Sequence, residues 1–185
     1  MRPEQIVEIE KNAQPEAVPP VTLLLHKPAG MRLDPKKPLD PVRRSSIDRS
    51  GMRVLPKHFA DQVCVASLAP HDSGLVVFTQ VFGIERKLTE DAGVIEHELA
   101  VDVEGDVTPE ALQRMRPARV SIGSQRDGHI TLRFAIKGPQ PGQVSALCEQ
   151  AGLKIIGVRR IRLGRVPLAG MAPGEWRYLL PDEKF

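Results

Sequence analysis

The sequence predicts an α+β domain in which one sheet of six or more strands carries only a few helices. Six short runs that are apolar or alternate in polarity have strand length and are bounded by turn residues. Only three stretches show helical spacing or helix-start signals. Strands and helices do not alternate regularly, as they would in a doubly wound parallel sheet, so a sheet domain of the α+β class is favoured.

The first half of the chain supplies three strand candidates and one short helix. The continuous apolar run VTLLLH at 21–26 has strand length and ends at a Lys-Pro-Ala-Gly turn. Residues 63–67 and 75–79 are rich in β-branched residues, and a Pro- and Gly-containing turn separates them. Residues 83–91 favour a short helix.

The second half supplies the other two helices and the remaining strands. Residues 98–103 alternate in polarity, as a half-buried strand does. Thr108 followed by Pro109 is typical of a helix start, and this helix is expected to run to about 115. The remaining candidates are a strand at 130–136, a helix at 144–151 that Gly152 ends, and one or two strands at 155–168.

Length and composition indicate one ordinary globular domain. The 185 residues are 41% hydrophobic and 26% charged, with a net charge of +3. Cys64 and Cys148 are isolated, so no disulfide framework is expected. No apolar stretch is long enough to cross a membrane, and the charged N-terminus does not resemble a secretory signal, so a cytoplasmic protein is expected.

Two basic zones flank one acidic zone along the chain. Residues 27–57 hold nine basic and three acidic side chains, whereas residues 85–110 hold nine acidic and two basic ones. Four further arginines fall within 159–165. Phosphate backbones are attracted to basic surfaces, so a nucleic-acid partner is plausible, although a proline-rich loop at 27–57 would be solvated in any case.

The arginine run has a second property. In Arg160-Ile161-Arg162-Leu163 the polar and aliphatic residues alternate, so a regular strand would place both arginines on one face. The residues that we expect to contact RNA phosphates are Lys27, Arg53, Lys57, Arg160 and Arg162.

No signature of a cofactor or metal site is present. The sequence has no GxGxxG, no GxxxxGK[ST] and no HExxH, and its five histidines lack metal-ligand spacing. We therefore expect no metal and no cofactor, and any chemistry would have to come from side chains alone.

Four motifs follow one another in an order that is specific as a set. The first two are His26-Lys27-Pro28-Ala29-Gly30, similar to Asn-Lys-Pro-x-Gly, and Ser73-Gly74-Leu75-Val76-Val77-Phe78-Thr79, similar to [Ser/Glu]-Gly-Leu-Leu-Leu-Leu-Thr. The others are residues 143–152 and Arg160-Ile161-Arg162-Leu163-Gly164, the latter followed by Gly170 and Gly174-Glu175-Trp176-Arg177-Tyr178-Leu179. From Leu23 onward the chain thus resembles the RsuA-type bacterial ribosomal-RNA pseudouridine synthases.

This resemblance implies a pseudouridine-synthase catalytic domain over residues 21–185, with a mixed, mostly antiparallel sheet and a few flanking helices. It also implies a structured, ribosomal RNA partner and the conversion of uridine to pseudouridine without a cofactor. Family members begin with an S4 RNA-binding domain, and residues 2–9 look like its last strand. We therefore expect 1–20 to be a remnant of that domain and a linker, either because the domain was lost or because the chain starts internally.

The resemblance places three substitutions at functional positions. The family's nucleophilic Asp in Gly-Arg-Leu-Asp-x-[Asp]-[Thr]-[Ser/Glu]-Gly falls on Ala69, five residues before Gly74. The Tyr of Lys-x-Tyr-Leu-Val falls on Leu99, and an Arg of Asn-Arg-Gln-Ile-Arg-Arg falls on Ser145. A buried Arg without its carboxylate is destabilising by about 3–5 kcal/mol, so loss of the Asp favours loss of the Arg.

Three hypotheses follow. The first is an RNA-binding pseudoenzyme, and the second is an active, atypical synthase that uses Asp72, or alternatively Asp61, as its nucleophile. Asp72 lies three residues beyond Ala69, which displaces its carboxylate by about 10 Å along an extended chain. The third is a protein-interaction module whose acidic 85–110 zone meets a basic partner. In each case we expect a monomer.

Overall fold

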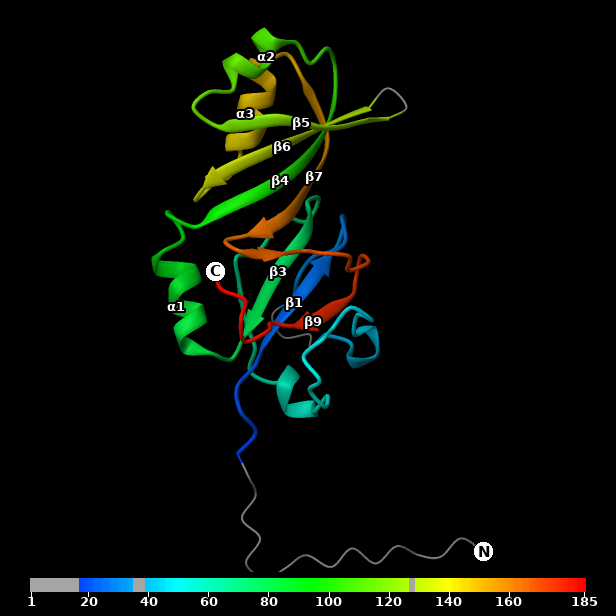
Figure 1. Cartoon of the computed structure of the whole chain (residues 1–185), viewed down its shortest axis with the longest axis vertical. Helices are drawn as coiled ribbons and strands as arrows, with labels where there is room; N and C mark the ends of the chain where they lie inside the picture. Colours follow the sequence, from blue (N-terminus) through cyan, green and yellow to red (C-terminus); the bar gives the residue numbers. More distant parts are fainter. Residues whose placement is uncertain (1–16, 35–38, 127–128) are drawn as a thin grey trace, which may run out of the picture.

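The computed structural model describes residues 17–34, 39–126 and 129–185, and it has the predicted α+β class (Figure 1). Nine strands form one sheet in the order β5-β6-β4-β7-β3-β1-β9, with β2 paired to β3 and β8 paired to β7. The elements are β1 (Thr22–Lys27), η1 (Pro41–Arg43), η2 (Pro56–Phe59), β2 (Val63–Val65), β3 (Ser73–Thr79), α1 (Phe82–Glu90), β4 (Glu96–Glu104), α2 (Pro109–Arg114), β5 (Arg119–Arg126), β6 (His129–Lys137), α3 (Gln143–Gln150), β7 (Lys154–Leu163), β8 (Val166–Pro167) and β9 (Trp176–Tyr178).

The predicted helices all form, at nearly the predicted positions. The hydroxyl of Thr108 accepts a hydrogen bond of 3.2 Å from the backbone N–H of Ala111, so Thr108 caps α2 as expected. Strands β5 and β9 were not predicted from the sequence. The segment of β5 is largely polar and contains Gly123, and that of β9 is only three residues long, so neither has an apolar strand pattern. The strand expected near 6–9 lies outside the described residues.

The sheet has two halves that meet at one short crossing. Every strand pair is antiparallel except β3 and β7, which run parallel and join only at Ser73 with Arg159 and Gly74 with Arg160. The upper half contains β5, β6, β4 and most of β7, and the lower half contains β3, β1 and β9 (Figure 1). The crossing therefore holds the two halves in a fixed relation.

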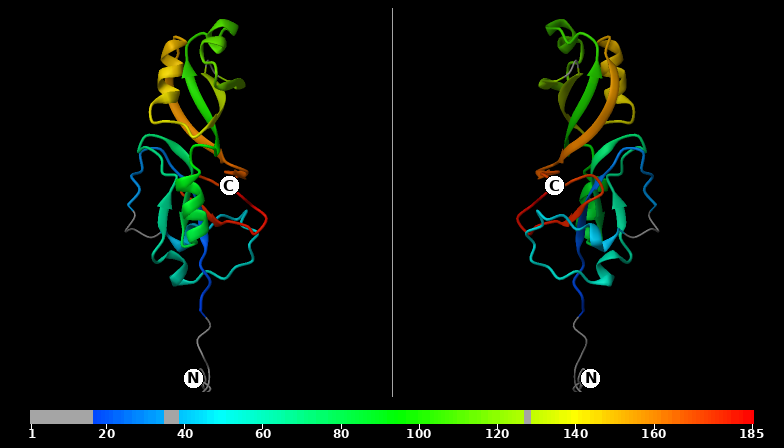
Figure 2. Two further views of the ribbon diagram at one scale, coloured as in Figure 1. Left: turned by 90° about the vertical axis from the view of Figure 1, so that its left-hand side faces the viewer. Right: turned by 90° about the vertical axis from the view of Figure 1, so that its right-hand side faces the viewer.

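Three apolar clusters support these halves. In the upper half, Phe134, Met115 and Cys148 belong to the cluster that joins α2 and α3 to one face of the sheet, and the side views show α3 against that face (Figure 2). In the lower half one cluster packs α1 against β3. The other cluster contains Trp176 and Tyr178, and apolar residues of the segment that follows β1 pack against it.

A β-bulge separates the two arginines that were expected to share a face. Glu98 pairs with Arg162, but the next residue, Leu99, pairs with Arg160, so Ile161 is the extra residue in β7. Because Glu98 and Leu99 are adjacent in β4, their partners project from opposite faces of the sheet. The prediction that Arg160 and Arg162 lie on one face is therefore wrong, since it assumed an unbroken alternation.

Replacement of Gly74 is expected to break the crossing. Gly74 has φ of +111°, and a Cβ built there would lie 2.3 Å from the carbonyl oxygen of Arg160. Gly74→Ala should lower the free energy of unfolding by at least about 3 kcal/mol, because both backbones must move apart. Gly83→Ala in α1, where a Cβ meets nothing within 4 Å, should change it by less than about 1 kcal/mol. Equal urea midpoints for the two variants would contradict this account of Gly74.

Candidate functional site

The loop between β2 and β3 carries Ala69 and is fixed mainly through its backbone. The N–H of Asp72 donates to the carbonyl of Ala69 at 3.1 Å, which closes a turn, and the N–H of Gly30 donates to the carbonyl of Pro70 at 2.8 Å. Ala66 has φ of 51°, in the left-handed region. The methyl group of Ala69 is half-buried in this ordered turn.

Lys27, the last residue of β1, ties this loop to the strand. Its side chain is buried, and Nζ donates to the carbonyl oxygens of Pro28 at 3.2 Å, Pro70 at 2.9 Å and Asp72 at 2.6 Å. Burial lowers the pKa of Lys27, and the negative charge of Asp72 opposes that shift. The three ammonium protons are thus directed at three carbonyl groups of the protein.

Arg160 ties the other side of the same loop to the crossing. The side chain is buried, Nε donates to the carbonyl of Leu75 at 2.7 Å, and a terminal nitrogen donates to the carbonyl of Ala66. Burial lowers the pKa of Arg160 to about 10, while Cys64 and Asp72 act in the opposite direction. The guanidinium remains charged at neutral pH, and backbone carbonyls are its hydrogen-bond acceptors.

Asp72 is the carboxylate of this loop. It is half-buried, and Oδ1 lies 3.5 Å from Nε2 of the exposed His71. It interacts electrostatically with both buried cations, Lys27 and Arg160. Asp61 is exposed and lies in a turn before β2, where it lines a depression with Lys57 and Val63.

The other two substituted positions lie in different surroundings. Leu99 is buried in the upper cluster and pairs with Arg160 across β4 and β7. Ser145 is exposed on α3 and lines a depression of about 470 Å³ with Glu149 and Lys154. Because Lys154 is six residues before Arg160 in β7, the two are about 20 Å apart along the strand. The structure thus brings Leu99 to the crossing and leaves Ser145 at the far end of β7.

Comparisons with known proteins identify the fold. No family model matches the chain. The dual-specificity RNA pseudouridine synthase RluF of Escherichia coli (strain K12) is 24% identical over 177 residues, which cover 91% of this chain and 57% of that protein. The uncharacterized RNA pseudouridine synthase YtzG of Bacillus subtilis (strain 168) is 29% identical over 90 residues, 48% of this chain and 38% of that protein. A crystal structure of a pseudouridylate synthase superposes with a TM-score of 0.68 at 18% identity, covering 87% of this chain and 70% of that one.

The chain is similar in sequence to RNA pseudouridine synthases. It has their fold, as the sequence motifs predicted. It spans little more than half the length of RluF.

Within this pseudouridine-synthase fold, the five predicted RNA contacts fall into two groups. Arg53 and Lys57 are exposed beside η2, where a phosphate group can reach them. Lys27 and Arg160 are buried against backbone carbonyls, and Arg162 is bonded to two glutamates. Spacing in the sequence could not separate these groups, because the difference depends on what each side chain contacts in the fold.

His97 lies close to this site but was not among the site residues predicted from the sequence. It is half-buried on β4, and burial, reinforced by the charge of Arg160, lowers its pKa to about 4. The signal was available, because His97 stands where the Lys of Lys-x-Tyr falls when Leu99 takes the Tyr position.

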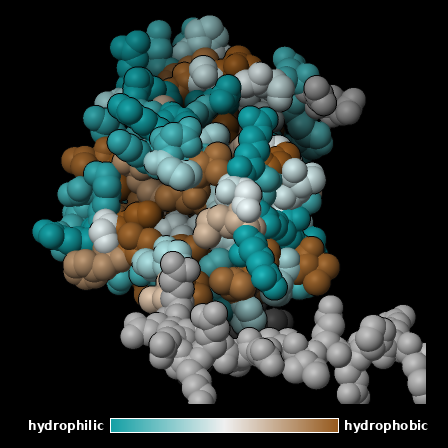
Figure 3. Space-filling model, turned by 60° about the horizontal axis from the view of Figure 1, so that its bottom comes forward, coloured by the Kyte–Doolittle hydropathy of each residue, from teal (hydrophilic) through white to brown (hydrophobic). Residues whose placement is uncertain are grey.

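The described residues offer neither a metal site nor a membrane-spanning helix. In the parts of the chain that the structure describes, no group of three or more His, Cys, Asp or Glu side chains could hold a metal ion. None of the helices there has the length and apolar character of a membrane span. Viewed from below, apolar side chains are interspersed with hydrophilic ones (Figure 3), and the exposed large ones, such as Val42, Phe82 and Val94, lie on separate segments.

The pKa of His97 predicts a pH dependence of stability. Between pH 6.5 and about 4 the unfolded chain binds a proton at this residue that the folded chain does not, so stability falls as the pH is lowered through that window. His97→Gln should remove this contribution to the slope of the free energy of unfolding against pH. The contribution is less than about 1.4 kcal/mol per pH unit, which is the limit for the binding of one proton. Urea unfolding of both proteins at pH 7 and pH 5 measures it, and identical losses on acidification would contradict the prediction.

Proposed function

We propose that this chain binds structured RNA, specifically ribosomal RNA, as a pseudouridine-synthase relative with weak or no isomerase activity. The proposal is carried by Ala69, the residue that the motif resemblance puts at the nucleophile position. Covalent catalysis on uridine requires a group that can form and break a bond with the nucleotide, and a methyl group has no lone pair for this. The names of the most similar curated proteins, which are RNA pseudouridine synthases, support RNA as the partner.

The surroundings of Ala69 support the same proposal. The loop keeps its shape through backbone contacts with Lys27 and Arg160, and these contacts do not need a side chain at residue 69. Leu99 cannot move a proton as a Tyr can, and Ser145 carries no charge to pair with a carboxylate. The framework for binding a nucleotide is thus separable from the groups that would react with it.

The proposed RNA contacts begin at Arg53 and Lys57, the exposed cations of the predicted set. Residues 21–185 form the proposed RNA-binding domain, and residues 1–16 lie outside the described residues. The protein acts as a monomer in the cytoplasm. The acidic-zone hypothesis is weaker, because Glu96 and Glu98 are already paired with arginines.

A second candidate is an active, atypical synthase that uses Asp72. Its specific support is that Asp72 is the carboxylate of the Ala69 loop and interacts electrostatically with both buried cations, Lys27 and Arg160. Its difficulty is reach, because reacting atoms must approach within about 3–3.5 Å. A nucleotide bound as in the family would face residue 69. The Asp72 carboxylate, three residues further along the chain, would have to reach that nucleotide.

RNA binding should depend steeply on salt. If phosphate contacts dominate, the affinity for a structured ribosomal RNA fragment should fall by about tenfold or more between 50 and 200 mM salt. Fluorescence anisotropy with purified protein measures this dependence. An affinity that stays flat over this range would contradict binding through phosphate contacts.

Isomerisation should be weak or absent, and any residual activity should not depend on Asp72. Tritium release from RNA labelled at carbon 5 of uridine should stay at or near background for the wild type. Substantial activity that Asp72→Ala abolishes, and that Asp106→Ala at an exposed loop carboxylate leaves intact, would establish the second candidate instead. Substantial release that survives both changes would contradict both candidates.

A further inference from the structure

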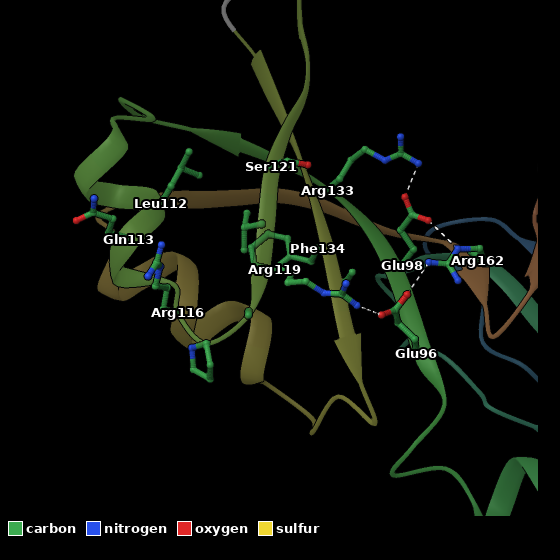
Figure 4. Close-up of a pocket in the computed structure, with 14 residues that line it drawn as sticks. Glu96, Glu98, Leu112, Gln113, Arg116, Arg119, Ser121, Arg133, Phe134 and Arg162 are labelled. Carbon is green, nitrogen blue, oxygen red and sulfur yellow. Dashed lines mark hydrogen bonds and ion pairs between the residues drawn. The ribbon is translucent and has the colours of Figure 1, made fainter.

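Five charged side chains form a connected row across the sheet face opposite to Leu99 and Arg160 (Figure 4). Arg162 lies at its centre, with Nε donating to Glu98 and a terminal nitrogen donating to Glu96, both at 2.8 Å. Arg119 of β5 pairs with Glu96, and Arg133 of β6 pairs with Glu98. Four neighbouring strands, β5, β6, β4 and β7, thus contribute to one network.

The two outer bases of the network are more exposed than its acids, and the central Arg162 is 29% exposed. The side chains of Glu96 and Glu98 are 22% and 17% exposed, whereas those of Arg119 and Arg133 are 74% and 51% exposed. Solvent therefore meets these two guanidinium groups first. Three arginines over two carboxylates also leave an excess of positive charge.

The carboxylates hold the guanidinium groups in place without using up their donors. The hydrogen bond from Arg162 is the main cause that lowers the pKa of Glu96, so this acid stays charged at neutral pH. Arg119 and Arg133 each contact a carboxylate through a terminal nitrogen, and a guanidinium group carries five N–H donors. Arginines restrained in this way lose less side-chain entropy when they bind an anion.

These side chains line a depression of about 910 Å³ that extends to α2, and Arg116, in the turn after α2, adds a further positive charge. Strands are spaced by about 4.8 Å, so the arginines of β5, β6 and β7 span about 14 Å. Successive phosphates of one strand of duplex DNA advance by about 3.4 Å along the axis, so a row of this length can meet several phosphates of a nucleic-acid strand. A polyanion with regularly spaced charges fits this depression better than an apolar ligand does.

We propose that the arginine face, defined by Arg116, Arg119, Arg133 and Arg162, binds the phosphate backbone of structured RNA. It is a second contact surface, on the side of the sheet that faces away from Leu99 and Arg160. The inference rests on the proposed function and adds to it where a second part of the RNA lies. Guanidinium groups suit this role because they bind phosphate in a bidentate manner.

The test is the double variant Arg119→Glu/Arg133→Glu. It should weaken binding to a structured ribosomal RNA fragment at least tenfold at 100 mM salt, and it should make the slope of log affinity against log salt shallower by about one to two. Arg119→Gln/Arg133→Gln should do the same to a smaller extent, and it serves if the charge reversal disturbs folding. Fluorescence anisotropy, with thermal unfolding as a check on the fold, measures both variants.

The matched control is Arg86→Glu/Lys87→Glu on α1, which also reverses two exposed cations and breaks two exposed ion pairs. This control should bind RNA within about twofold of the wild type. If the wild type binds RNA and the Arg119/Arg133 variants match the control, the arginine face is not an RNA contact, although the proposed function stands. If the wild type does not bind RNA, both fail. If the Arg119/Arg133 variants keep RNA binding but lose binding to polyglutamate, the face belongs to an acidic polypeptide and the proposal is overturned.

Discussion

The guanidinium group of Arg160 is the contact on which the rest of the structure depends. It lies where β3 and β7 meet, the one parallel pair among the strands of the described residues. It donates to the carbonyl groups of Leu75 on β3 and of Ala66 in the loop that leads to β3. A buried charge is tolerated only when its hydrogen-bonding groups are satisfied. Here backbone carbonyls satisfy them, so the side chain stabilises the crossing without a paired carboxylate.

Under the proposed function, in which Ala69 stands at the nucleophile position, this arrangement explains how the loop keeps its shape without that side chain. Lys27 and Arg160 hold the loop around Ala69 through its carbonyl groups, and every residue type supplies a carbonyl at those positions. The side chain at 69 is therefore free to change without loss of the fold. The fold and the reaction are under separate constraints, and likeness of fold alone does not establish the reaction.

Much of the fold could be predicted from the sequence, because periodicity and turn residues report local structure directly. The buried strand β1 follows from the continuous run at 21–26, and the start of α2 follows from Thr108. The site was less predictable. That Lys27 is buried depends on carbonyl groups more than forty residues away, and the separation of Arg160 from Arg162 depends on one extra residue in β7. Such facts belong to the packed chain and not to any window of sequence.

The pairing of β9 with β1 has a consequence for the order of folding. Leu25 is opposite Trp176, so β1 must wait for a strand that is made about 150 residues later. The strands from β4 to β7, by contrast, are consecutive in the chain and can associate as soon as residues up to 163 have left the ribosome. Contacts of low sequence separation form fastest. The upper half can thus form before β9 pairs with β1, and the edge of β1 that faces β9 is the last part of the lower sheet to be covered.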